Sequence, residues 1–373
     1  MTDLASRNAR KGGRKGARAP RRQRPARGRG VLRVLVVLAL LAAAIAFWAA
    51  NRYAGFADAP IDGLAQGDSL VLESGDSFTV MLRKLHAAGA AGGHDTEWRV
   101  LGRETGAAGH LQVGEYALPP GTTPRQLLER MRDGKVISHR VTIVEGWNLR
   151  ELRAALAKAE PLLHETDGMD DAALMRAIGH PGMPPEGRFL PETYQYTRGD
   201  SDVDVLKRAY AAMDQALDAA WASRAPGLPL ASKDEALTLA SIVEKETGIA
   251  EERDEIAGVF VRRLRLGMRL QTDPTVIYGM GARYAGNIRK ADLLADTPYN
   301  TYTRPGLPPT PIAMPGKAAL QAATHPAGGD ALYFVAIGDG SGRHVFTASL
   351  AEHENAVRQY LRNYRAQRKA ATP

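Results

Sequence analysis

The stretch LASIVEKETG, residues 239–248, predicts a helix that directs a glutamate toward the protein interior. Its inward-facing stripe recurs at i, i+3, i+4 and i+7, in Leu239, Ile242, Val243 and Glu246. Seven residues at about 100° each fall only about 20° short of two full turns, so Glu246 continues the apolar stripe. Glu244 projects away from this stripe and is expected to face solvent. We therefore expect a helix over roughly 233–247 with one inward carboxylate.

Two interpretations of Glu246 follow from the residues alone. An inward glutamate is more often an ion-pair partner than a catalyst, and Arg253 stands seven residues downstream. A catalytic role is favoured by three segments downstream, which supply amides, hydroxyls and aromatic faces, the groups that bind a sugar chain. These segments are QTDPT, VIYG and YNTYT. The candidate substrate-binding residues are Gln271, Asp273, Tyr278, Tyr299, Asn300 and Tyr302. Asp273 is more simply explained as an N-cap and Glu145 as the polar end of a strand, although both are second candidates for assisting catalysis.

The rest of the pattern predicts an α+β protein with two folded parts. Residues 51–69 are expected to form a short stalk, and residues 70–138 a small α+β module. Within the module, runs of alternating polarity precede a helical pattern, TPRQLLERMRDGK, with Thr123 as its N-cap and Gly134 at its end. The Gly/Ala-rich piece at 88–105 is expected to be a loop.

Residues 139–373 are expected to form the larger, mixed α+β domain. A strand is predicted at 139–144, and Asp273 followed by Pro274 should open a short helix. Six prolines exclude regular structure from 297–316. The other expected helices cover about 149–163, 203–221, 252–267 and 350–368, and the last follows a hairpin with the turn GDGSG.

The excess positive charge of the chain lies in its N-terminal tail. The whole chain carries a net charge of +8, yet residues 1–30 alone carry eleven Lys or Arg against a single acid, Asp3. The body of the protein is therefore mildly acidic, and the tail, residues 1–33, is too polar to fold on its own. Because no aromatic residues interleave with the arginines, we do not expect nucleic-acid binding.

An uncharged apolar segment, VLVVLALLAAAIAFWAA, follows the tail at 34–50. It is long enough to cross a bilayer when Arg33 snorkels, and Trp48 suits the far membrane interface. The positive-inside rule places the tail in the cytoplasm and residues 51–373 beyond the inner face. A cleaved signal peptide is the alternative, although Trp48 fits a cleavage site poorly. We expect a single transmembrane anchor.

The composition also limits the chemistry. The chain has no cysteine, which excludes disulfides, zinc–thiolate sites and thiol nucleophiles. Its nine histidines show no His-x3-His spacing, so no metal and no cofactor is expected.

Several long motifs carry a family resemblance. They are ASIVEKET (240–247), VFVRRLRLGMRLQTDPTVIYG (259–279), YNTYTRPGLPPTPIAMPG (299–316), AATHPA (322–327), LYFVA (332–336), VEGW (144–147) and FLPETY (189–194). Together they resemble the YceG-like family of membrane-bound endolytic peptidoglycan transglycosylases. The resemblance is dense from about residue 141 to the C-terminus and looser over 70–138, which takes the place of the family's LysM-like subdomain.

The resemblance implies a function and a catalytic residue. The family's essential residue, the second glutamate of E-K-E-T, falls on Glu246. It implies cleavage of the β-1,4 bond between N-acetylmuramic acid and N-acetylglucosamine within nascent strands, leaving 1,6-anhydro ends and terminating elongation. It further implies an inner-membrane protein with its catalytic domain in the periplasm and wall synthases as possible partners. The alternatives are a non-catalytic scaffold that binds peptidoglycan and a muramidase that uses water.

Overall fold

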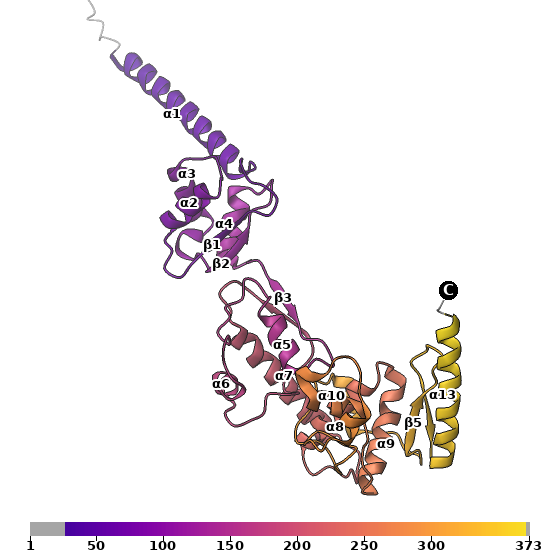
Figure 1. The fold of residues 1–373 in the computed structure, drawn as a ribbon. Helices are drawn as coiled ribbons and strands as arrows, with labels where there is room; N and C mark the ends of the chain where they lie inside the picture. Colours follow the sequence, from indigo (N-terminus) through magenta and orange to yellow (C-terminus); the bar gives the residue numbers. More distant parts are fainter. Residues whose placement is uncertain (1–26, 371–373) are drawn as a thin grey trace, which may run out of the picture.

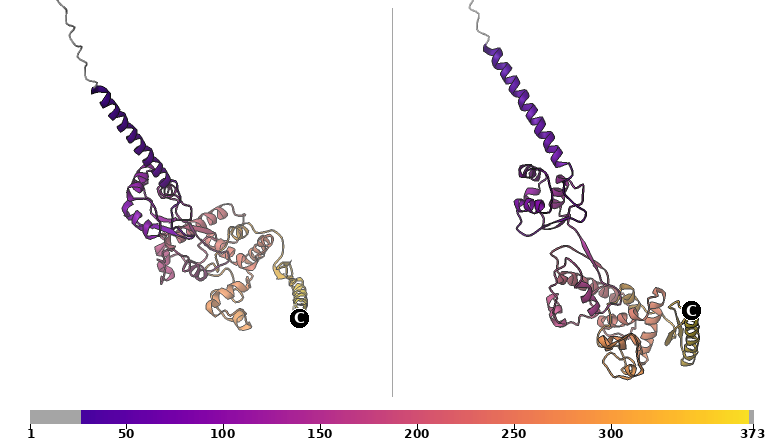
Figure 2. Two further views of the ribbon diagram at one scale, coloured as in Figure 1. Left: turned by 90° about the horizontal axis from the view of Figure 1, so that it is seen from above. Right: turned by 45° about the horizontal axis from the view of Figure 1, so that its top comes forward.

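The computed structural model describes residues 27–370. The predicted basic tail therefore lies outside the described residues up to residue 26. The molecule is elongated, with a long apolar helix at one end and the C-terminal helix at the other (Figures 1 and 2). The long helix, α1 (Arg27–Ala57), contains a segment, Gly30–Ala57, that is long and apolar enough to cross a membrane, and residues 30–52 of it are exposed.

The first folded part follows α1 and is a small module of strands and helices. Its elements are β1 (Ser69–Leu72), α2 (Phe78–Ala87), α3 (Asp95–Glu104), β2 (Gly114–Ala117) and α4 (Pro124–Asp133). The two strands pair antiparallel, with Leu70 opposite Tyr116. The helix α4 has the predicted caps, because the Thr123 hydroxyl accepts the N–H of Gln126 and Gly134 closes the helix in the left-handed conformation. The expected α+β character of 70–138 is confirmed, while its LysM-like assignment stays a prediction.

Two local expectations for this part of the chain were wrong. Residues 95–104, within the expected loop, form α3, because Trp98 and Leu101 bury one turn apart and a capping box closes the helix start. Residues 78–87 form the helix α2. The expected stalk begins as helix, since α1 runs to Ala57, which is fully buried in the module.

The second folded part begins with a two-stranded antiparallel sheet of β3 (His139–Thr142) and β4 (Thr193–Tyr196). Three helices accompany it: α5 (Leu149–Leu156), α6 (Asp171–Ala177) and α7 (Asp202–Ala222). The predicted strand at 139–144 is confirmed, and α5 is shorter than the expected helix over 149–163. Together these elements enclose one apolar cluster around Phe189 and Leu206.

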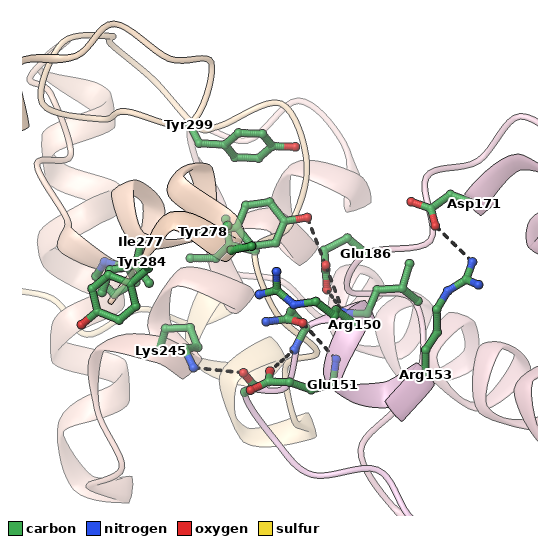
Figure 3. A pocket seen from close by; sticks show the side chains of 17 residues that line it. Arg150, Glu151, Arg153, Asp171, Glu186, Lys245, Ile277, Tyr278, Tyr284 and Tyr299 are labelled. Carbon is green, nitrogen blue, oxygen red and sulfur yellow. Dashed lines mark hydrogen bonds and ion pairs between the residues drawn. The ribbon is translucent and has the colours of Figure 1, made fainter. Parts of the chain in front are cut away.

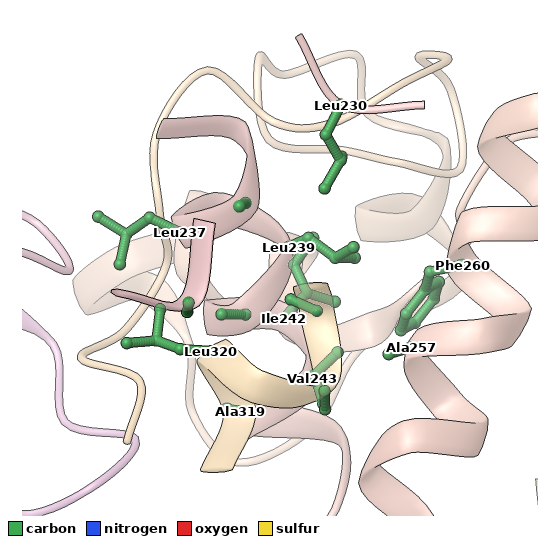
Figure 4. Packing of buried hydrophobic residues seen from close by; sticks show 14 of the residues in the cluster. Leu230, Leu237, Leu239, Ile242, Val243, Ala257, Phe260, Ala319 and Leu320 are labelled. Carbon is green, nitrogen blue, oxygen red and sulfur yellow. The ribbon is translucent and has the colours of Figure 1, made fainter. Parts of the chain in front are cut away.

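The main helical layer packs around α8 (Lys233–Glu246), as the close view of the core shows (Figure 4). It comprises α9 (Arg253–Arg265), α10 (Asp273–Met280), α11 (Lys290–Leu294) and α12 (Lys317–Thr324). Leu239 and Phe260 lie in one cluster of buried side chains with Leu320. Every residue from Ala236 to Val243 is buried, so α8 is the central helix of this layer. Because α8 is surrounded by other elements, a polar side chain at the end of this helix can be shielded from water.

A proline-rich loop and a C-terminal unit complete the fold. Residues 297–316 contain no helix or strand, as predicted from their six prolines. The hairpin of β5 (Tyr333–Ala336) and β6 (His344–Thr347) packs against α13 (Leu350–Ala370), which confirms the predicted strand–turn–strand–helix order. The described chain is thus an α+β protein with one candidate membrane helix.

Candidate active site

The helix α8 brings Glu246 to the edge of the core. It begins at Ser232, whose hydroxyl accepts the N–H of Glu235 at 3.3 Å. Its apolar stripe is fully buried in the core, and Glu246 is its last residue. The predicted helix and the inward phase of Glu246 are confirmed. The end of a buried helix therefore presents a carboxyl group at the border between core and surface.

The Glu246 carboxyl is held in a protonatable state. Burial raises its pKa from an ordinary value of 4.5 to about 7, because desolvation disfavours the charged form. A hydrogen bond donated by the Thr272 hydroxyl acts in the opposite direction and lowers the pKa, while the nearby Asp273 charge raises it slightly. No Lys, Arg or His nitrogen within the described part of the chain lies within 4.0 Å of this carboxyl. At neutral pH the group can therefore both donate and accept a proton.

Glu244 does not face solvent, which corrects the expectation from helical phase. Its side chain is only 6% exposed and accepts the N–H of Gly316 at 2.9 Å. Arg253 lies 3.9 Å from Glu244, so the ion pair considered for Glu246 belongs to its neighbour. Burial raises the Glu244 pKa, and the nearby charge of Glu145 adds to that effect. Glu244 therefore anchors the segment around Gly316 beside the end of α8.

A network of threonines fixes the partner of Glu246. The Thr272 N–H donates to the Thr301 hydroxyl at 3.1 Å, and the Thr275 hydroxyl donates to the Thr272 carbonyl at 2.8 Å. The hydroxyls of Thr275 and Thr301 lie 2.9 Å apart. All three side chains are buried, so the segment that starts α10 is joined rigidly to the proline-rich loop. This rigidity orients the Thr272 hydroxyl toward Glu246.

Gln271 lies at the start of this segment in a strained conformation. It has a φ of 54°, the one positive φ among the non-glycine residues described. A left-handed conformation costs a residue with a side chain about 1–2 kcal/mol. Arg263 holds the turn in place, since its guanidinium donates to the Leu270 carbonyl at 2.8 Å and lies 3.4 Å from the Gln271 side-chain oxygen. The Gln271 side chain is exposed beside Thr272, as a substrate-binding residue requires.

Asp273 and Tyr302 form a second pair next to Glu246. Asp273 is the first residue of α10 and not its N-cap, a position that Thr272 occupies, so the predicted start was one residue late. The Tyr302 hydroxyl donates to Asp273 at 2.6 Å. Burial raises the Tyr302 pKa, with further contributions from the charges of Asp273 and Glu246. The structure thus brings together three predicted residues, Glu246, Asp273 and Tyr302.

Asn300 does not face this site, and its predicted contact with substrate is corrected. The residue is only 1% exposed, and its amide nitrogen lies 2.7 Å from the Ala295 carbonyl and within hydrogen-bond distance of two further carbonyls. Its side-chain oxygen accepts the N–H of Tyr302 at 2.9 Å. Both polar atoms are therefore used inside the loop. Asn300 positions Tyr302 and leaves no atom free for a ligand.

Tyr278 and Tyr299 line a separate cavity of about 850 Å³, which we call the α5 cavity (Figure 3). Their ring centroids are 4.8 Å apart. The Tyr278 hydroxyl donates at 3.0 Å to Glu186, a buried carboxyl that also accepts the Leu149 N–H at 3.1 Å. Burial raises the Glu186 pKa to about 7. The volume lies within the range typical of ligand sites, roughly 300–1,000 Å³.

The α5 cavity is lined by residues next in sequence to Glu246 and Asp273. Lys245 lines it and directly precedes Glu246 in α8, and Pro274, also in the lining, directly follows Asp273. On two separate elements the lining of the cavity therefore lies one residue along the chain from Glu246 or Asp273. The Glu246 side chain itself is not part of the lining.

Sequence reasoning missed three contributors to the candidate site, namely Thr272, Lys245 and Glu186. Thr272 was visible as a member of QTDPT, but its role depends on a contact across 26 residues. Glu186 approaches Tyr278 across 92 residues, which no local pattern reveals. A polar residue between Pro185 and Gly187, in a turn before a buried Phe189, was the one available signal.

The chain belongs to the YceG-like family, which it matches over residues 70–359. A solved YceG-like protein of Listeria monocytogenes is similar in structure, with a TM-score of 0.50 and 28% identity. That similarity covers 77% of this chain and 98% of the Listeria chain.

Two relatives are named endolytic murein transglycosylase. The protein of Bacillus subtilis strain 168 is 31% identical over 276 residues, covering 69% of this chain and 74% of that protein. The protein of Streptococcus pneumoniae serotype 2 strain D39 is 31% identical over 213 residues, covering 56% of this chain and 36% of that protein.

Proposed function

We propose that this protein is a membrane-anchored endolytic murein transglycosylase with Glu246 as its catalytic acid and base. The observation that carries the proposal is a partly exposed carboxyl whose pKa burial raises to about 7, at the end of a core helix. Membership of the YceG-like family and relatives named for this activity support the same assignment. The substrate is peptidoglycan, cut between N-acetylmuramic acid and N-acetylglucosamine.

A single carboxyl suffices for this reaction. Hydrolytic glycosidases use two carboxylates, because one protonates the leaving oxygen while the other attacks or activates water. In a lytic transglycosylase the C6 hydroxyl of N-acetylmuramic acid attacks its own anomeric carbon. The nucleophile is tethered to the electrophile, so a bimolecular step becomes intramolecular.

Glu246 acts twice in this mechanism. The protonated carboxyl first donates its proton to the glycosidic oxygen, and the C1–O bond to N-acetylglucosamine breaks. The resulting carboxylate then takes the proton of the C6 hydroxyl as the new C1–O6 bond forms. No water is consumed, and the carboxyl returns to its protonated state. A pKa near 7 suits both steps, since neither protonation state is strongly favoured at neutral pH.

Exposed polar and aromatic groups around Glu246 position the strand in this proposal. Gln271 and Asp273 flank Thr272, and Tyr302 reaches Asp273 from the proline-rich loop, so these groups approach the sugar nearest the cleaved bond. Tyr278 and Tyr299 offer ring faces at the α5 cavity. Flat apolar sugar faces stack on such rings, and this stacking supplies affinity that does not depend on the charge of the ligand.

The proposed location follows from α1. The helix over Gly30–Ala57 supports a membrane anchor, and the arginine-rich tail before it supports a cytoplasmic N-terminus. The folded parts then lie in the periplasm, outside the inner membrane. Glycan strand termination and contact with wall synthases are part of this proposal and rest on family resemblance.

The test is the Glu246→Gln variant assayed on purified peptidoglycan. We expect a folded, membrane-inserted protein that releases no 1,6-anhydro ends, while the wild type releases them. Mass spectrometry identifies the product, because an anhydro end lacks one water relative to a hydrolysed end. Retained anhydro product in the variant would refute the role of Glu246.

Hydrolysis is the second candidate function, favoured by one observation. Asp273 is an exposed carboxylate close enough to raise the Glu246 pKa, so it could activate a water. Its hydrogen bond from Tyr302 is the argument against this role, since that bond already occupies one of the carboxylate oxygens. Hydrolysed ends without anhydro ends from the wild type would favour this alternative.

A further inference from the structure

The α5 cavity has more available positive than negative charge. Its acidic side chains already have partners inside the protein: Glu151 caps α5 at 2.8 Å, and Asp171 pairs with Arg153 at 3.1 Å. Glu186 is buried and accepts the first N–H of α5. The pKa of Glu186, raised by burial, further reduces its negative charge near neutral pH.

Two cations in the lining have no acidic partner. Arg150 is exposed and makes no ion pair or side-chain hydrogen bond within the described residues. Lys245 donates to the Gly146 carbonyl at 3.1 Å, and no carboxylate of residues 30–367 lies within 4.0 Å of its ammonium group. They come from α5 and α8, so they bring positive charge to the cavity from two separate elements.

We propose that the α5 cavity binds the anionic peptide stem of peptidoglycan through Arg150 and Lys245. This inference rests on the proposed function, because it names the part of the substrate that the region beside Glu246 recognises. The stem is attached through a lactyl group to C3 of N-acetylmuramic acid and carries free carboxylates. The enzyme then acts preferentially on peptide-bearing strands.

The position of the cavity agrees with this assignment. C3 is separated from the anomeric carbon by a single ring atom, so a stem on the sugar being cleaved starts close to Glu246. Lys245, adjacent to Glu246 in α8, is the first cation such a stem meets, and Arg150 lies on the neighbouring helix α5. Tyr278 and Tyr284 provide apolar surface for the uncharged parts of the peptide. A neutral sugar would have no use for two cations.

Binding is tested with full-length protein in detergent, carrying Glu246→Gln so that the ligand is not consumed. The probes are a disaccharide–tetrapeptide and the same disaccharide with its lactyl carboxyl capped as an amide, titrated by calorimetry. We expect the peptide-bearing probe to bind more tightly, and added salt to reduce that difference. Arg150→Gln should weaken its binding by roughly three- to tenfold, or about 0.7–1.4 kcal/mol. Arg150→Lys should restore most of the affinity, because it keeps the charge.

The matched control is Arg140→Gln, which removes one exposed arginine outside the cavity. It should leave the affinity for both probes unchanged. Equal binding of the two probes would overturn the proposal, and so would a peptide preference that survives both Arg150→Gln and high salt. Failure of the peptide-bearing probe to bind at millimolar concentration would overturn it as well.

A rate comparison separates this inference from the proposed function. Protein with Glu246 intact is given glycan strands with stems and strands from which an amidase has removed them. We expect faster release of anhydro ends from the peptide-bearing strands and a smaller ratio of the two rates in Arg150→Gln. Equal rates on both strands would overturn the stem site and leave the transglycosylase standing. Absence of anhydro ends from either strand would overturn the proposed function itself.

Discussion

Replacing Thr272 by valine tests how the Glu246 pKa is set. The Thr272 hydroxyl donates to the Glu246 carboxyl and stabilises its charged form, against the desolvation that disfavours that form. Valine keeps the shape of threonine and loses the hydroxyl. The backbone bonds of Thr272 to Thr301 and Thr275 do not depend on this side chain, so the threonine network stays in place.

The expected size of the effect follows from the bond that is lost. A hydrogen bond to a charged group contributes about 1.5–3 kcal/mol, and about 1.4 kcal/mol corresponds to one pKa unit. Because the protonated carboxyl also accepts a weaker bond from the hydroxyl, the differential effect is smaller, and the Glu246 pKa should rise by about one unit. The direction is upward, since the variant loses a group that favoured the carboxylate.

The assay is the pH dependence of kcat/KM for release of anhydro ends, which reports ionisations of the free enzyme. In the wild type, activity that needs the protonated acid falls as pH rises through about 7. In Thr272→Val this fall should occur about one unit higher. Thr272→Ser keeps a hydroxyl and should behave as the wild type. An unchanged or lowered midpoint in Thr272→Val would refute the assignment of the Thr272 hydroxyl as the group that lowers this pKa.

Three further predictions concern stability. The folded protein raises the Glu246 pKa from 4.5 to about 7, so the stability that the protonated group contributes is complete below 4.5 and is lost as pH rises through about 7. Glu246→Gln should therefore unfold at higher denaturant than wild type at about pH 8, by roughly 2 kcal/mol, and show little gain at about pH 5; an equal gain at both pH values would contradict the buried acid. Gln271→Gly should stabilise the protein by about 0.5–1 kcal/mol in the same measurement, because glycine adopts the positive φ without strain, whereas Gln271→Ala should not. Arg253→Met should destabilise the protein by about 1–3 kcal/mol at neutral pH, because Glu244 loses its cation. Adding Glu244→Gln should recover part of this loss. No recovery would show that Arg253 acts through packing.

The sequence predicted the inward direction of Glu246 because helical phase is a local property of α8. The same argument failed for Glu244, since it assumes that a helix buries only one face. Burial of every residue from Ala236 to Val243 shows that α8 is enclosed on most sides. The segment around Gly316 covers the side on which Glu244 lies, and its contact is made across 72 residues. Which additional faces a helix buries depends on such distant segments.

For the candidate substrate-binding residues, too, the sequence revealed local properties but not distant contacts. Composition identified QTDPT and YNTYT as polar and aromatic, which was enough to find Asp273 and Tyr302. It did not separate Asn300, whose amide is occupied inside its own loop, from residues whose polar atoms are free. The sequence could not predict a role for Glu186, because its hydrogen-bond partner Tyr278 is distant in sequence.

The continuity of α1 has a mechanical consequence. Arg52 near its C-terminal end pairs with Glu97 at 3.0 Å, Asp58 just beyond the helix pairs with Arg125 at 2.8 Å, and Phe56 packs edge-on against Trp98 at 5.2 Å. The candidate membrane helix α1 and the first module are therefore joined without a flexible joint. A change in the tilt of the anchor, for instance in a thinner bilayer, would therefore rotate the module by the same angle. Bilayer thickness would thereby alter the height above the membrane at which this protein meets a glycan strand.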